Sequence, residues 1–248
     1  MTLQFKSLVL GSLLLWGSSL LAQNSGSDSL RQTMTTSIQY DIGSNTYESD
    51  TASSKESSQG DTFTFSTAAG QNRLVGISIR SARNNVNFAL NDSKMTTRWQ
   101  DLMISYRMGW FTPAVGAALS EVQIETDSGD YVDIYRASLG AGLGMRVPLW
   151  HHLVVYGDFR FFEKPPTPKF ASLTNSSDAV PDGTARKLDA TLDSRNEFDI
   201  GTSVDISRDF LDFVVGYRVK SYDLIVEGVK NSEYQAGIYA GFKIGAYF

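Results

Sequence analysis

The chain has 248 residues, of which 42% are hydrophobic and 20% are charged, and its formal net charge is -5. Its length suffices for one large β-structure, and the acidic balance argues against nucleic acid as a partner. The absence of cysteine excludes disulfides, thiolate metal sites and a cysteine nucleophile.

Residues 1–22 have the pattern of a secretory signal peptide. Lys6 precedes an apolar stretch that runs from Leu8 to Leu21, and Ala22 follows it. A membrane helix needs about 20 apolar residues, whereas this stretch is shorter and is interrupted by glycine and serine. We therefore expect a signal peptide over 1–22, a short N-terminal segment over 23–32 and one domain over 33–248.

From about residue 33 the sequence alternates between apolar and polar residues with a period of two, which indicates β-strands. In the first such segment Ile38 and Tyr40 share one face, while Gln39 and Asp41 share the other. The serine- and threonine-rich residues 46–60 predict a loop. The run TFTFSTA, which follows them, predicts the second strand.

The stretch 74–90 changes phase. Val75 and Ile79 lie on one face of an ideal strand, but Val86 lies on the other. A bulge or a turn near residues 83–85 would account for the change. With TFTFSTA counted as a strand the chain has ten strands, and if that run is only loop the count is eight.

The later segments are long. The clearest of them, over 135–146, alternates apolar residues with Gly140, Gly142 and Gly144. A strand that crosses a membrane needs about 9–11 residues, more than the five or six of a typical soluble strand. Tight turns are predicted at 109–111, 148–151 and 207–210, and longer loops at 91–97, 126–130, 164–194 and 224–233. Short turns on one side and longer loops on the other are typical of outer-membrane barrels.

The composition of the polar faces distinguishes a barrel from a soluble sandwich. A sandwich exposes its polar face, so that face is rich in lysine, glutamate and threonine. Here it carries glycine, serine, arginine and aspartate, and glycine rows fit the narrow lumen of a small barrel. The sequence therefore predicts an all-β fold, a closed antiparallel transmembrane β-barrel of ten strands, with eight as the alternative.

Charges of both signs are predicted to face the lumen. The lumen-lining candidates are Arg107, Arg136, Arg146, Asp158, Arg160, Asp199, Asp205, Arg218 and Lys243, with Asp41, Arg80, Asp101, Glu197 and Lys220 in the same phase. Buried charges are costly unless they are paired, so one interpretation is a self-neutralising network that fills the barrel. The other is a narrow aqueous path whose arginines set its selectivity.

No catalytic or cofactor motif stands out. The two histidines, His151 and His152, fall in a predicted tight turn, away from any serine and carboxylate that could complete a triad. The run GAGLG lacks the spacing of a nucleotide-binding loop, and no calcium-binding loop is present. We expect neither enzymatic activity nor a cofactor or a metal.

The chain ends on YQAGIYAGFKIGAYF, in which Tyr234, Phe242, Ile244 and Phe248 share one face. This ending resembles the terminal strand of bacterial outer-membrane β-barrel proteins, and the hairpin around residues 135–161 resembles those of the small OmpA- and OmpX-type barrels. The resemblance implies an outer-membrane location and lipid contacts. It also implies that these four residues form the signal read by the barrel-assembly machinery.

Two functions remain open at this stage. The first is a structural or narrow-pore role, with passive passage of small solutes. The alternative is a surface-binding protein that displays residues 46–60 and 163–194 to an extracellular ligand on a plugged barrel.

Overall fold

The computed structural model describes residues 34–49, 55–69, 74–88, 93–125, 131–163, 190–207 and 210–247. They belong to one compact unit, Thr33–Phe248. The predicted signal peptide and the segment 23–32 lie outside the described residues. In the part of the chain that is described, no helix is long and apolar enough to cross a membrane.

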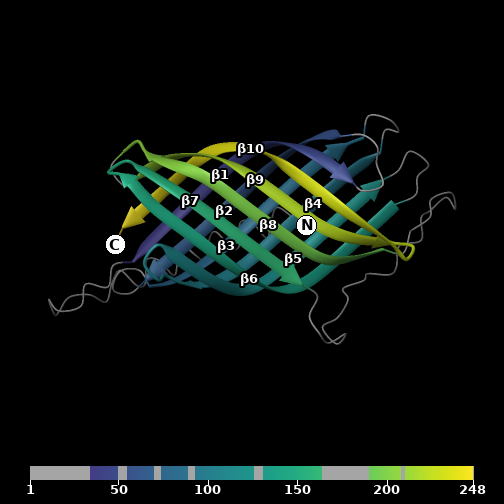
Figure 1. Cartoon of the computed structure of the whole chain (residues 1–248), viewed down its shortest axis with the longest axis horizontal. Coiled ribbons are helices and arrows are strands. Elements are labelled where there is room, and N and C mark those ends of the chain that lie inside the picture. The colour runs from purple at the N-terminus through teal and green to yellow at the C-terminus, as the bar shows by residue number, and fades with distance from the viewer. Residues whose placement is uncertain are drawn as a thin grey trace, which may run out of the picture. The chain divides into compact units, whose positions relative to one another are not determined.

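Ten antiparallel strands form one closed barrel, around which they wind obliquely (Figure 1). In chain order they are β1 (Thr35–Ser49), β2 (Glu56–Ala69), β3 (Val75–Asn87), β4 (Lys94–Tyr106), β5 (Phe111–Glu125), β6 (Tyr131–Trp150), β7 (Leu153–Glu163), β8 (Ala190–Asp205), β9 (Leu211–Val226) and β10 (Val229–Tyr247). Each strand pairs with its neighbours in sequence, and β10 pairs with β1, so the barrel has no open edge. The predicted ten-stranded, all-β closed barrel is confirmed, and the alternative of eight strands is wrong.

Several strands are longer than predicted. Because β1 runs to Ser49 and β2 starts at Glu56, the loop predicted over 46–60 is wrong for most of its length. The loop predicted over 224–233 is also wrong, because β9 and β10 meet in a tight hairpin. Its two turn residues, Glu227 and Gly228, both have positive φ, at 50° and 79°, which is the geometry of a two-residue type I′ turn.

Strand β4 begins at Lys94 and β8 begins at Ala190, so the predicted loops 91–97 and 164–194 are both shorter than expected. The short turn before β5 contains Gly109, whose φ of 62° suits a residue without a side chain. The loop residues 126–130 and 164–189 lie outside the described residues.

Strand β3 contains no bulge, and the predicted break near residues 83–85 is wrong. Its pairing with β2 and with β4 is continuous in register. The apolar residues change sides instead: Ile79 points outward and is exposed, whereas Val86 points inward and is buried. The strand stays regular, but its apolar residues lie on the outward face at one end and on the inward face at the other.

The other strands show the same exchange, which divides the barrel into two halves. In the half next to the short turns, which we call the belt half, the outward residues are apolar; they include Ile38, Tyr40, Ile42, Val75, Ile77, Ile79, Leu102, Ile104, Val115, Leu119, Leu139, Leu143, Phe159, Phe198, Ile200, Val215, Tyr217, Ile238, Phe242 and Ile244. In the other half, the distal half, the outward residues are polar; they include Ser44, Thr46, Gln59, Asp61, Ser81, Arg83, Thr96, Arg98, Glu121, Gln123, Asn196 and Ser221. On β3 the period of two continues across the boundary without a break.

Apolar side chains from seven strands fill the distal half, and we call them the distal core. The core consists of Tyr47, Ala82, Val86, Met95, Trp99, Val122, Val132, Ile134, Leu192, Tyr222 and Leu224. Trp99 is only 1% exposed and packs edge-on against Tyr222, with ring centroids 5.4 Å apart. Burial of this apolar surface stabilises the distal half as it would stabilise a soluble barrel.

Two inward glycines make room for aromatic side chains. A Cβ atom at Gly140 would lie 2.3 Å from Cδ1 of Phe162, and one at Gly216 would lie 2.6 Å from the hydroxyl oxygen of Tyr239. Both aromatic residues are buried. The glycines of the inward face therefore allow bulky side chains from neighbouring strands to cross the lumen.

Candidate functional site: the barrel lumen

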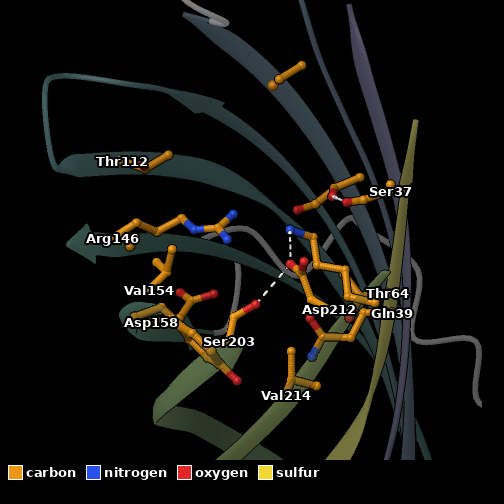
Figure 2. Close-up of a pocket in the computed structure, with 18 of the residues that line it drawn as sticks. Ser37, Gln39, Thr64, Thr112, Arg146, Val154, Asp158, Ser203, Asp212 and Val214 are labelled. Carbon is orange, nitrogen blue, oxygen red and sulfur yellow. Dashed lines mark hydrogen bonds and ion pairs between the residues drawn. The ribbon is translucent and has the colours of Figure 1, made fainter. Parts of the chain in front are cut away.

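A cavity of about 540 Å³ occupies the belt half of the lumen and reaches the short turns, where His151 and His152 line it. Figure 2 shows Arg146 extending into this cavity from one wall, toward the side on which Asp212 lies. Hydroxyl and amide side chains such as Thr64 and Gln39 line the remaining wall. The belt half is thus polar and open inside, although it is apolar outside.

Deeper in the lumen, five cations and five carboxylates form what we call the charge layer. Its members are Arg80, Arg160, Arg195, Arg218 and Lys220, and Asp41, Asp101, Asp158, Glu197 and Asp199. The formal charges of the ten groups sum to zero. Such balance is needed because an unpaired charge is costly to bury.

Asp101 on β4 is the centre of the layer. Its carboxylate accepts a hydrogen bond from Nη2 of Arg80 at 2.9 Å and another from Nη2 of Arg195, and Nη1 of Arg160 lies 3.5 Å away. Arg80 also donates two hydrogen bonds to Glu197. These contacts connect strands β3, β4, β7 and β8 across the barrel.

Arg218 on β9 forms the second centre. Its Nε donates to Oδ1 of Asp199 at 2.6 Å, and its Nη1 donates to Oδ1 of Asp41 at 2.9 Å and to Oγ1 of Thr62 at 2.6 Å. The guanidinium lies over the ring of Tyr239, 4.3 Å from the centroid. One arginine thereby joins three strands other than its own through hydrogen bonds.

Arg195 connects the charge layer to the distal core. Its guanidinium lies 4.2 Å from the ring centroid of Phe162 and 4.9 Å from that of Trp99, which are favourable distances for cation–π contacts. The sequence pattern did not single out Arg195, because the predicted loop ended at residue 194, directly before it. The missed signal was its spacing from Glu197 and Asp199, which places all three on one face.

A register shift explains why Arg195 and Leu192 are both buried although they are three residues apart. The pairing of β8 with β9 is irregular between these two residues, and a bulge changes the phase of a strand by one residue. The irregularity therefore lies in β8, and not in β3, where the sequence had suggested one.

The predicted lumen residues lie at two depths. Eight of them line the cavity: Arg107, Arg146, Asp158, Arg160, Asp199, Asp205, Arg218 and Lys243. The ninth, Arg136, is partly buried on the inward face of β6 and does not line the cavity. At the mouth, Nζ of Lys243 lies 3.5 Å from Asp212, and Nδ1 of His152 lies 3.4 Å from Asp205.

Three of the four predicted insertion-signal residues lie on β10. Tyr234, Phe242 and Ile244 all point outward and are exposed. Phe248 lies outside the described residues. The role of these four residues in barrel assembly stays a prediction.

The outer surface of the distal half carries polar contacts between neighbouring strands. Glu121 accepts hydrogen bonds from Arg98 at 3.2 Å and from Tyr135 at 2.9 Å. Near the last hairpin, Lys230 contacts Asp223 at 2.9 Å, and this hydrogen bond raises the pKa of Lys230. Within the described ranges, no group of three histidine or acidic side chains is arranged to hold a metal ion.

The fold and the lumen define the chain as a closed ten-stranded antiparallel barrel with an apolar belt and a charged interior. No protein-family model matches the chain, and no curated protein matches it in sequence. Several solved barrel structures are similar to it in the path of the chain.

Neisserial surface protein A is 15% identical, with 84% of this chain and 96% of that chain covered and a TM-score of 0.38. The outer-membrane protease OmpT from Escherichia coli is 10% identical, with 90% and 99% covered and a TM-score of 0.45. The translocator domain of the autotransporter NalP from Neisseria meningitidis is 11% identical, with 94% and 95% covered and a TM-score of 0.35. Likenesses of this strength assign no function to the chain.

Proposed function

We propose that this protein is an outer-membrane β-barrel whose belt half lies in the membrane and whose distal half projects from the cell surface. The observation that carries the proposal is the exchange of polarity along the strands. An outward apolar band with its polar groups inside suits a hydrocarbon environment. An outward polar surface around an apolar core suits water. The predicted signal peptide agrees with export.

The distal half is tall enough to act as a platform. On β1 it spans residues 44–49, and six residues at about 3.3 Å each, tilted by about 45°, rise roughly 14 Å above the belt. The longest connection of the barrel, residues 164–189 between β7 and β8, is at this end. We place the working surface of the protein here.

A lumen that is blocked by side chains favours surface display over a narrow pore. A solute that crossed would have to separate the ion pairs of the charge layer, and breaking one buried pair costs about 3–5 kcal/mol. It would then have to displace Trp99, Tyr222 and the rest of the distal core. We infer a structural and display role, without catalysis, because the only histidines lie at the short-turn end.

Planar-bilayer recording tests whether the lumen is blocked. We expect the folded protein, incorporated at known density, to give no discrete conductance steps. Heat-modifiable migration on SDS gels serves as the folding control. Reproducible unitary conductance steps from the folded protein would contradict a blocked lumen and favour the narrow pore.

Deletion of residues 166–187 tests display while β7 and β8 stay intact. The probe is adhesion of cells that carry the protein to surfaces coated with extracellular-matrix proteins. A matched control replaces the same residues with a glycine–serine segment of equal length. Adhesion that is lost in both variants supports display by this segment, and adhesion equal to that of the parent protein in both contradicts it.

A further inference from the structure

We propose that the cavity in the belt half is a binding site for a small solute that carries phosphate or carboxylate groups. The solute enters at the short-turn end and leaves by the same route. If the distal half projects from the cell surface, as proposed above, the short-turn end faces the periplasm. The site itself rests on the geometry of the cavity.

The walls of the cavity carry an excess of positive charge. Its cationic lining residues are Arg80, Arg107, Arg146, Arg160, Arg218 and Lys243, and its anionic ones are Asp158, Asp199, Asp205 and Asp212. Six cations against four carboxylates give the residues that line the cavity a formal charge of +2. A cleft with charges of one sign in excess and walls of low dielectric concentrates counter-ions.

The charge layer is neutral as a whole, so the excess left at the mouth is +1, from three cations against Asp205 and Asp212. Arg80, Arg160 and Arg218 belong to the charge layer, whose ten groups are balanced. The other three cations lie nearer the short turns. They are Arg107, which follows β4, Arg146 on β6 and Lys243 on β10. A solute can therefore meet three cations and two carboxylates, from separate parts of the wall, before it reaches the charge layer.

The mouth offers the contacts that an oxyanion needs. Arginine donates paired hydrogen bonds that match phosphate and carboxylate oxygens. Thr112, next to Arg146 in Figure 2, and the hydrogen-bonded pair Ser37 and Ser66 supply hydroxyl groups on the same lining. A volume of about 540 Å³ falls within the range of about 300–1,000 Å³ found for small-molecule sites.

The cavity is blind, which favours binding over transit. The Asp101 and Arg218 centres close its floor, and the distal core lies beyond them. A solute that enters is surrounded by the inner wall of the belt half on all sides but one. Retention in the cavity, and not flow, is the property to measure.

The absence of cysteine allows a direct test, because a single introduced thiol is a unique reporter. We introduce Thr112→Cys in the cavity and, as the reference, Thr96→Cys on the outer distal surface. Each folded variant reacts in detergent with an anionic and a cationic methanethiosulfonate of similar size. The ratio of the two rates cancels differences in thiol exposure and pKa. We expect the ratio in the cavity to favour the anionic reagent by about tenfold over the reference, as potentials of several kT predict.

Charge removal identifies the groups responsible. Arg107→Gln with Arg146→Gln should reduce the cavity ratio to near that of the reference position. The matched control, Arg83→Gln with Arg98→Gln, removes the same charge from the outer surface and should leave the cavity ratio unchanged. Inorganic phosphate should slow the cavity reaction several-fold more than chloride at equal ionic strength, and only while Arg107 and Arg146 are present.

Equal ratios at the two positions, or no protection by phosphate, would overturn the proposed site. Heat-modifiable migration shows in each case that the variant is folded. Because the reaction is run in detergent, its outcome depends neither on membrane orientation nor on conductance. Failure of the anion site is therefore distinct from failure of the proposed surface role.

Discussion

The belt half and the distal half are made by the same ten strands, yet each is the inverse of the other. On β3, Ile79 faces outward in the belt half, and Val86 faces inward in the distal half. The period of two specifies a strand in both halves. The medium around the barrel decides which of the two faces is apolar.

The interiors of the two halves are held together by different forces. Buried ion pairs and their hydrogen bonds connect the walls in the charge layer, where Asp101 contacts three arginines. Dispersion and the hydrophobic effect hold the walls together in the distal core around Trp99. Substitutions in each interior should therefore lower the free energy of unfolding much more than matched substitutions on the outer surface at a similar height.

The largest effect is expected from Asp101→Ala. Three arginines would lose a shared counter-charge inside the barrel, and loss of one partner from a buried pair costs about 3–5 kcal/mol. The matched variant Glu121→Ala removes the partner of Arg98 from the outer surface, where the pair is partly exposed and a surface pair contributes about 0–1 kcal/mol. Urea unfolding in detergent micelles measures both free energies, and similar losses would contradict the buried charge layer.

Trp99→Ala tests the distal core. Truncation of a buried tryptophan costs about 3–5 kcal/mol, and the near-ultraviolet circular dichroism of the packed ring should decrease with it. The neighbour Gln100, which faces outward on the same strand, should tolerate alanine with a loss below about 0.5 kcal/mol. If the two alanine variants unfold at the same urea concentration, the distal half has no packed core.

The smallest of these effects concerns two glycines on the inward face of β6. A Cβ at Gly140 would overlap Phe162, so Gly140→Ala should cost about 1–3 kcal/mol. The control Gly144→Ala is expected to be neutral, because the nearest atom to its Cβ would be 3.5 Å away. Equal midpoints of unfolding for the two variants would show that Phe162 does not cross the lumen at this height.

The sequence was sufficient to predict the strand number and the phase of most lumen residues, because alternation is continuous over most of each strand. It was insufficient to predict the strand ends in the distal half, where the outward face becomes polar. Residues 46–49 and 56–60 suggested a loop because serine and threonine predominate there, although they continue β1 and β2. A strand that leaves the membrane keeps its hydrogen bonds but exposes polar residues, and this composition is shared with loops.

The charge layer could be predicted only in part. Nine of its ten members were predicted to face the lumen, but their partners could not be assigned, because pairing across the lumen depends on strand register. Arg195 was missed because the predicted loop ended directly before it, although it is in phase with Glu197 and Asp199. The cavity could not be foreseen either, since its volume depends on which side chains cross the lumen.

The central claim is that one regular strand passes from a lipid-facing to a water-facing surface without a break, and a nitroxide scan along β3 tests it most directly. In the cysteine-free chain, single labels are placed at positions 75–87 in lipid vesicles. Outward positions up to Ile79 should be accessible to oxygen, and outward positions from Ser81 onward should be accessible to a water-soluble nickel complex. Inward positions such as Ala82 and Val86 should be protected from both. A shift of the two-residue period near residues 83–85, or access of oxygen to Val86, would contradict the account.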